Sequence, residues 1–97
     1  MPGKPLSTET KKALGEVVRR LRKARGLSQE QLGLDADIQR KFISKIETGV
    51  SEPSVTTLFA LGEALNETPS SILAAVEQEV RKTPKPQNAR RKRSAAR

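Results

Sequence analysis

The chain has 97 residues and carries 19 lysines and arginines against 11 acidic residues, which gives a net charge of +8. That length suffices for one small domain with a single core. The absence of cysteine and histidine excludes disulfide bonds, thiolate metal sites and the commonest catalytic base, so we expect no metal, no cofactor and no enzymatic activity. The longest apolar run, 72–76, is too short to cross a bilayer, and the first residues lack the apolar core of a secretory signal. We therefore expect a cytoplasmic protein.

The positive charge is concentrated at the C-terminal end. Residues 1–80 contain eleven basic and eleven acidic residues, which cancel, whereas residues 81–97 contain eight basic residues and no acid. This composition predicts a flexible basic tail from residue 81 onward. Such a tail indicates either a polyanionic partner, such as nucleic acid, or a disordered end that aids solubility. Its densest part, a candidate DNA contact, comprises Arg90, Arg91, Lys92 and Arg93.

The N-terminal part of the sequence predicts a flexible segment over residues 1–8, followed by a helix over residues 9–25. Apolar residues in this helix recur at the i, i+3, i+4, i+7 spacing of one buried stripe. Gly26 offers the left-handed conformation that ends a helix. The stripe comprises Leu14, Val17, Val18 and Leu21.

Two short helices are predicted next. Ser28 and Gln31 form the capping-box pattern that begins a helix, and we expect this helix to close after about two turns, near residues 35–37. A further helix is predicted over residues 39–48, with Gly49 as the residue that follows its C-terminus. The expected inward residues of the two helices are Leu32, Ala36, Ile43 and Ile46.

Two more helices complete the predicted fold. Ser54 is placed to cap the fourth helix, and Asn66 to end it in the left-handed region. Thr68 followed by Pro69 begins the fifth, which runs to residue 79 or 80. No strand pattern competes, so the predicted fold is an all-α, compact five-helix bundle over residues 9–80. The residues expected to face inward are Val55, Leu58, Leu61 and Leu65 in the fourth helix and Ile72, Leu73 and Val76 in the fifth.

Residues 13–76 also carry a set of short motifs at fixed spacing. The segments are 27–32 (LSQEQL), 36–38 (ADI), 42–49 (FISKIETG), 53–55 (PSV) and 57–58 (TL). In this combination they closely resemble the Cro/CI-type (XRE-type) helix-turn-helix family of transcriptional regulators. The resemblance implies a lambda-repressor-like fold, double-stranded DNA as the partner, and a place on the nucleoid in the cytoplasm.

Three positions depart mildly from the family pattern. Gly33 stands where alanine is usual, at the point where two steeply crossed helices need a small residue. Asp37 replaces the usual left-handed glycine of the turn, and aspartate tolerates that region better than most residues. Gln39 is a weaker cap than the usual serine, threonine or aspartate, so the start of its helix is predicted only to within about one residue.

The helix predicted over residues 39–48 corresponds to the recognition helix of the family, whose N-terminal part enters the major groove. Arginine and lysine can donate to guanine, and glutamine can pair with adenine. The alternative for the cations of this helix is an ordinary solvated basic face. Phe42 could either contact a thymine methyl group or pack against the preceding helix. The candidate base-reading residues are Gln39, Arg40, Lys41, Phe42, Ser44 and Lys45.

The resemblance also implies contacts to the DNA backbone and one structural ion pair. Gln29 matches a phosphate-binding position at a helix N-terminus, where an anion is favoured; the alternative is an exposed polar residue. Arg22 and Glu47 match a pair that fastens the first helix to the recognition helix in several family members, so we expect Glu47 to be structural. The candidate phosphate contacts are Ser28, which is better placed as a cap, Gln29, Thr48 and Ser51.

The favoured function is a dimeric transcriptional regulator, a repressor, on a near-palindromic site, because one small recognition helix reads few base pairs. Self-association is expected around Ile72, Leu73 and Val76, unless these residues only fill the monomer core. No sensor domain follows in the sequence, so no small-molecule ligand is expected. Two alternatives stay open: an antitoxin or coactivator-like module that binds a protein such as a toxin, and nonspecific nucleic-acid binding led by the tail.

Overall fold

The computed structural model describes residues 4–82 of the chain, and the side chains of residues 8–82. These residues form five α-helices and no strand, which confirms the predicted all-α fold. In this part of the chain, no helix is long and apolar enough to cross a membrane. The helices are α1 (Lys4–Ala24), α2 (Gln29–Ala36), α3 (Arg40–Glu47), α4 (Val55–Leu65) and α5 (Pro69–Lys82).

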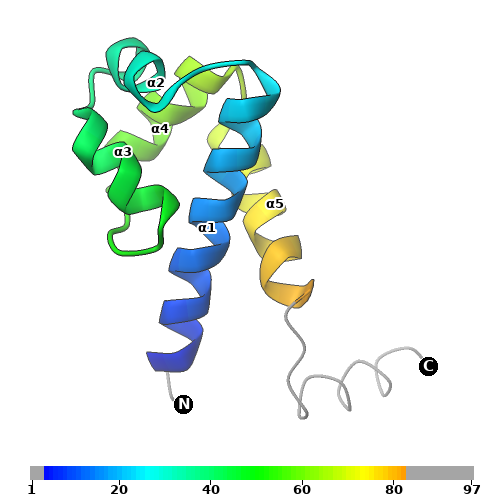
Figure 1. The fold of residues 1–97 in the computed structure, drawn as a ribbon. Helices are drawn as coiled ribbons and strands as arrows, with labels where there is room; N and C mark the ends of the chain where they lie inside the picture. The colour runs from blue at the N-terminus through cyan, green and yellow to red at the C-terminus, as the bar shows by residue number, and fades with distance from the viewer. Residues whose placement is uncertain (1–3, 83–97) are drawn as a thin grey trace.

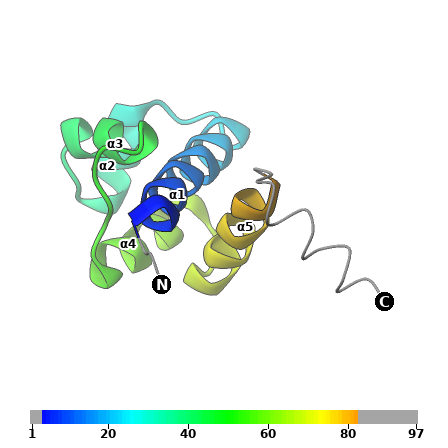
Figure 2. The same cartoon turned by 90° about the horizontal axis from the view of Figure 1, so that it is seen from below.

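The long helix α1 is central to the arrangement. It contacts α5 and α3, while α2 contacts α3 and α4. Figure 1 and Figure 2, which differ by a quarter turn, both show α1 between the α2–α3 pair and α5. The helix predicted to read DNA is therefore supported by α1 and α2, and α5 lies on the far side of α1.

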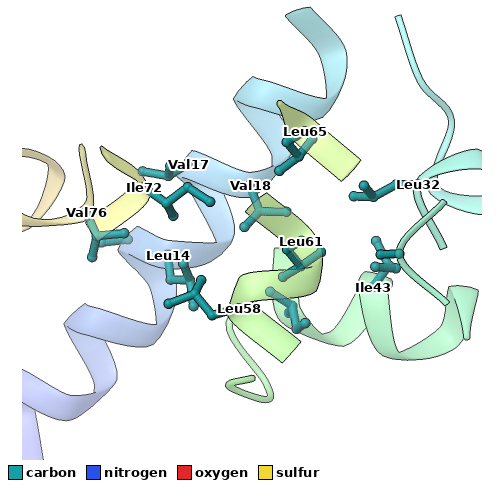
Figure 3. Close-up of a cluster of buried hydrophobic side chains, with 13 residues drawn as sticks. Leu14, Val17, Val18, Leu32, Ile43, Leu58, Leu61, Leu65, Ile72 and Val76 are labelled. Carbon is teal, nitrogen blue, oxygen red and sulfur yellow. The ribbon is translucent and has the colours of Figure 1, made fainter. Parts of the chain in front are cut away.

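The core contains apolar side chains from all five helices. Figure 3 shows Ile72 and Val76 of α5 close to Val17 of α1 at one end of the cluster. At the other end, Leu32 of α2 lies near Ile43 of α3. Removing one such side chain from water contributes about 1.5–3 kcal/mol. All five are buried, as the apolar spacing predicted.

The start of α1 differs from the prediction. A flexible segment was expected over residues 1–8, but the helix begins at Lys4, five residues before the expected start at Glu9. Pro5 is compatible with this start, because a proline in the first helical turn lacks only an N–H group that would have no partner within the helix. The flexible N-terminus was therefore predicted too long.

The end of α5 also differs from the prediction. The helix continues past the expected end at residue 79 or 80 and includes Lys82. Two residues assigned to the flexible tail, 81 and 82, are thus helical. The rest of the predicted tail lies outside the described residues.

Short polar side chains begin the helices as expected. The Gln31 N–H donates to the Ser28 hydroxyl oxygen at 3.0 Å, and the Ser28 N–H donates to the Gln31 side-chain oxygen at 3.0 Å. Ser54 and Thr68 each accept a hydrogen bond from the backbone N–H three residues further on. Gln39 precedes α3 without a side-chain cap, in keeping with its weak capping tendency.

The chain reverses direction after its helices at the residues that the sequence indicated. Gly26 and Gly49 have φ angles of 72° and 79°. Asp37 and Asn66, at 59° and 61°, adopt the same left-handed conformation without being glycine. Short polar side chains of this kind tolerate that region, so the turn after α2 forms without the glycine that is usual there.

Two residues that were expected to face inward are exposed. Val55 is 72% exposed and Leu73 is 51% exposed. Val55 is the first residue of α4, one turn before Leu58, where that helix reaches the core. On α5, Ile72 and Val76 share one face, and the next residue after Ile72 is turned by about 100°. The prediction was therefore wrong for Val55 and Leu73.

Gly15 marks a close approach between α1 and α3. A Cβ atom at this position would lie 2.6 Å from the backbone oxygen of Glu47 and would also overlap the backbone oxygen of Ile46. Real Cβ atoms essentially never come so close to such atoms. The missing side chain thus allows α1 to touch the last turn of α3 directly.

We expect Gly15→Ala to lower the free energy of unfolding by about 1–3 kcal/mol, the range for overpacked sites. Helix propensity alone predicts an increase in the free energy of unfolding, because alanine stabilises a helix interior by up to about 1 kcal/mol relative to glycine. Urea unfolding of the wild type and the variant, followed by far-UV circular dichroism, shows whether overpacking or helix propensity has the larger effect. Unchanged or increased stability would contradict the close approach.

Candidate nucleic-acid interface

The α2–α3 pair is joined by a tight turn of the helix-turn-helix type. The Ile38 N–H donates to the Gly33 carbonyl at 2.8 Å, and a Cβ atom at Gly33 would overlap the Ile38 backbone oxygen. Ile38 is half-buried and packs against the core. A small residue is therefore needed at Gly33, as predicted, and the turn sets the position of α3 relative to α2.

Helix α3 has one buried and one exposed face. Ile43 and Ile46 are fully buried. Arg40, Lys41 and Lys45 are exposed, and within the described part of the chain none of the three has an ion-pair partner. The exposed face therefore presents three uncompensated positive charges.

The other three base-reading candidates differ in their exposure. Gln39 is exposed and makes no side-chain hydrogen bond to the helix that it precedes. Ser44 is half-buried. Phe42 is half-buried and packs against the core, which favours the packing alternative for this side chain. Gln39 is thus exposed, like the three cations, whereas part of the Phe42 side chain is buried against the core.

The structure brings Arg22 of α1 and Glu47 of α3 together as a buried ion pair. The Arg22 Nε donates to Oε2 of Glu47 at 2.6 Å and Nη2 donates to Oε1 at 3.0 Å, while Nη1 donates to the Leu27 carbonyl at 2.8 Å. The Arg22 and Glu47 side chains are 10% and 3% exposed. The hydrogen bond to Glu47 raises the pKa of Arg22 although burial opposes it. The guanidinium group therefore stays charged, and the two helices are joined by a bidentate contact.

Gln29 of α2 is a third member of this network. Its Nε2 donates to Oε1 of Glu47 at 3.0 Å. The carboxylate therefore accepts hydrogen bonds from both α1 and α2. From its sequence position Gln29 was expected to contact phosphate or to be an exposed polar residue. Its contact with Glu47 was not predicted, because no spacing rule relates it to a residue on another helix. The second N–H of its amide is the donor that the Glu47 contact leaves available.

The remaining phosphate candidates lie at the two ends of the α2–α3 unit. The Ser28 oxygen accepts the cap hydrogen bond of α2, which leaves its O–H group as a donor. The Thr48 hydroxyl donates back to a carbonyl of its own helix at 3.0 Å. Ser51 is half-buried in the loop after α3. The Gln29–Glu47 hydrogen bond places the N-terminus of α2 beside the C-terminus of α3.

Two other predictions concern the tail and metal binding. The tail residues proposed to contact DNA lie outside the described residues. Among residues 8–82, no group of acidic side chains is arranged to hold a metal ion. The tail contact predicted for the chain comprises Arg90, Arg91, Lys92 and Arg93.

Comparison with known proteins gives the family of the chain. A family model described as Helix-turn-helix matches residues 18–72. The chain belongs to this family. The match includes all of α2, α3 and α4, and it confirms the resemblance to Cro/CI-type (XRE-type) helix-turn-helix regulators.

Individual relatives support the same assignment. A protein of Sinorhizobium fredii, described as the uncharacterized HTH-type transcriptional regulator y4dJ, is 33% identical over 57 residues, which cover 59% of this chain and 74% of that protein. The restriction-modification controller protein C.AhdI of Aeromonas hydrophila has a TM-score of 0.63 at 31% identity and covers 64% of this chain and 94% of its own. The clp gene regulator ClgR of Corynebacterium glutamicum shares the fold, with a TM-score of 0.72 at 21% identity over 90% of this chain and 88% of its own. The chain is thus a helix-turn-helix protein of the DNA-binding regulator class.

We expect Glu47→Ala to lower the free energy of unfolding by about 3–5 kcal/mol, because Arg22 would keep a buried and unpaired charge. Glu79→Ala is the control. Glu79 pairs with Arg20 at 3.2 Å, but the Arg20 side chain is 52% exposed, so its loss should cost less than about 1 kcal/mol. Urea unfolding of both variants gives the comparison, and equal small losses would show that Glu47 forms an ordinary surface pair.

Proposed function

We propose that this protein binds double-stranded DNA sequence-specifically as a dimeric transcriptional repressor on the nucleoid in the cytoplasm. In this proposal α3 of each subunit enters the major groove at one half of a near-palindromic operator. The observation that carries the proposal is the exposed face of α3, with three uncompensated cations opposite two fully buried isoleucines. A helix held in this way presents donors to the groove while its two isoleucines stay in the core.

The proposed base contacts come mainly from the start of α3. Residues in the N-terminal part of a recognition helix contact base edges, which favours Gln39, Arg40 and Lys41. Arginine and lysine can bind O6 and N7 of guanine, and glutamine can bind adenine through N6 and N7. Lys45 follows Lys41 by one helical turn and extends the same face. Ser44, which is half-buried, is a less accessible contact.

The proposed phosphate contacts lie at the N-terminus of α2. Backbone N–H groups without partners and the positive end of the helix dipole favour an anion there. The Ser28 hydroxyl and the second amide N–H of Gln29 are donors at this end. Because Glu47 fixes the Gln29 amide, the backbone contact is oriented before DNA binds.

A dimer is proposed because two half-sites supply the specificity that one short helix lacks. The dimer surface expected around Ile72, Leu73 and Val76 needs correction, since Ile72 and Val76 are buried in the monomer core. Leu73 of α5 remains exposed, and Phe59 of α4 is also a large exposed apolar side chain. We place the two-fold contact on these C-terminal helices, where the same patch of each subunit faces its copy.

Selection from a random duplex library at about 150 mM salt tests the proposed sequence reading, since this ionic strength screens nonspecific attraction. We expect enrichment of an inverted repeat whose half-site centres are about 10 bp apart. Absence of any enriched motif, with binding that disappears as the salt concentration rises, would contradict the proposal that the protein is a sequence-specific regulator.

Variants of single arginines then test the role of α3. Arg40→Ala should weaken binding to the selected site by about 1–3 kcal/mol and relax the preference at one position. Arg20→Ala is the control, because Arg20 pairs with Glu79 on the α5 side of α1. Equal losses of affinity in both variants, with no change in preference, would argue against base reading by Arg40.

Sedimentation equilibrium of two leucine variants tests the dimer surface. Leu73→Asp should shift the chain from dimer to monomer, because a charge in an apolar contact is costly. Leu34→Asp is the matched control, since Leu34 on α2 is even more exposed, at 76% against 51% for Leu73. A dimer unaffected by Leu73→Asp would rule out this surface.

A further inference from the structure

Helix α1 carries two cations, next to α3, that the interface described above does not use. Lys12 and Arg19 are exposed and lie two helical turns apart on one face of α1. Gly15, where α1 touches the last turn of α3, lies between them in sequence. A Cβ atom at Gly49, two residues after α3, would lie 3.2 Å from the Cα of Lys12. This part of α1 therefore flanks the C-terminal end of α3.

The charges of Lys12 and Arg19 are not balanced by ion pairs. The neighbouring Arg20 faces α5 and pairs with Glu79. Within the described residues neither Lys12 nor Arg19 has such a partner, and Glu16, within about one turn of each, pairs with neither. Lys12 lines a hollow together with Glu9, Glu16 and Glu79 but forms no ion pair with them. Arg20 is thus neutralised by an ion pair, whereas Lys12 and Arg19 form none among the described residues.

The end of α3 that these cations flank is also the end at which phosphate binding is proposed. The Gln29–Glu47 hydrogen bond places the N-terminus of α2 beside the last residue of α3. With the first turn of α3 in the major groove, the phosphates that border the groove are the groups nearest to this end. Lys12 and Arg19 continue the same border from α1.

We propose that Lys12 and Arg19 bind phosphate groups of the DNA backbone and extend the interface along α1. This inference rests on the DNA binding proposed above. Phosphate contacts of this kind add salt-dependent affinity and fix the orientation of the protein, but they do not distinguish one base sequence from another. The pair therefore adds affinity and leaves the sequence preference to α3.

The test is the salt dependence of binding to two duplexes of equal length, the selected operator and a random sequence. The full chain is compared with Lys12→Gln, Arg19→Gln and the double variant. The slope of log affinity against log salt should fall in magnitude by about 0.9 for each lost contact, and by about 1.8 for the double variant, on both duplexes. Arg20→Gln, which removes the adjacent arginine on the α5 side, should leave the slope unchanged.

The outcomes separate this inference from the proposed function. If the wild-type chain binds the operator but the double variant keeps its slope, the inference is overturned and DNA binding stands. If the double variant keeps its slope and loses unfolding free energy, the cations stabilise the negative end of α3 instead, which also overturns the inference. If the wild-type chain binds neither duplex, the proposed DNA binding fails, and this inference fails with it.

Discussion

The buried carboxylate of Glu47 is the constraint on which the DNA-binding unit depends. At 3% exposure, an ionised carboxylate would cost several kcal/mol without partners. It receives hydrogen bonds from Arg22 on α1 and Gln29 on α2. Arg22 also donates to the Leu27 carbonyl, just before α2 begins. One charged group on α3 therefore requires both neighbouring helices to keep a single position, because hydrogen bonds to a carboxylate are directional whereas apolar packing is not.

Backbone contacts at three glycines complement this network. Cβ atoms would overlap the end of α3 at Gly15 and the α2–α3 turn at Gly33, and one at Gly62 would lie 2.6 Å from the Glu67 carbonyl oxygen. In each case a helix meets another segment of main chain without a side chain between them. The domain has few aromatic residues to fill wider gaps, with phenylalanine at two positions and no tryptophan or tyrosine. At these three places the main-chain segments pack directly against each other, in keeping with the close packing of protein interiors.

Local features could be predicted from the sequence, whereas contacts between helices could not. The Ser28 cap and the left-handed Asn66 depend only on residues within one helical turn, so short-range patterns suffice. Periodicity gives the angular position of a residue but not whether the helix has reached the core at that point, which is why Val55 was misplaced. Gly15 gave no signal, because its role depends on where α3 crosses α1. The Arg22 contact to Glu47 was expected from family resemblance, and the contact of Gln29 to the same carboxylate was not.

The distribution of charge explains how a body without net charge can present a positive face. Residues 1–80 contain equal numbers of acids and bases. Glu47 is the acid within α3, and it is buried against Arg22, so it does not offset the exposed cations of that helix. Glu79, on the far side of α1, lies within ion-pair distance of both Arg20 and Lys82. Glu47 and Glu79 are thus each held in ion pairs and do not offset the exposed cations of α3. The local potential that a polyanion meets is set by this placement and not by the net charge of the body.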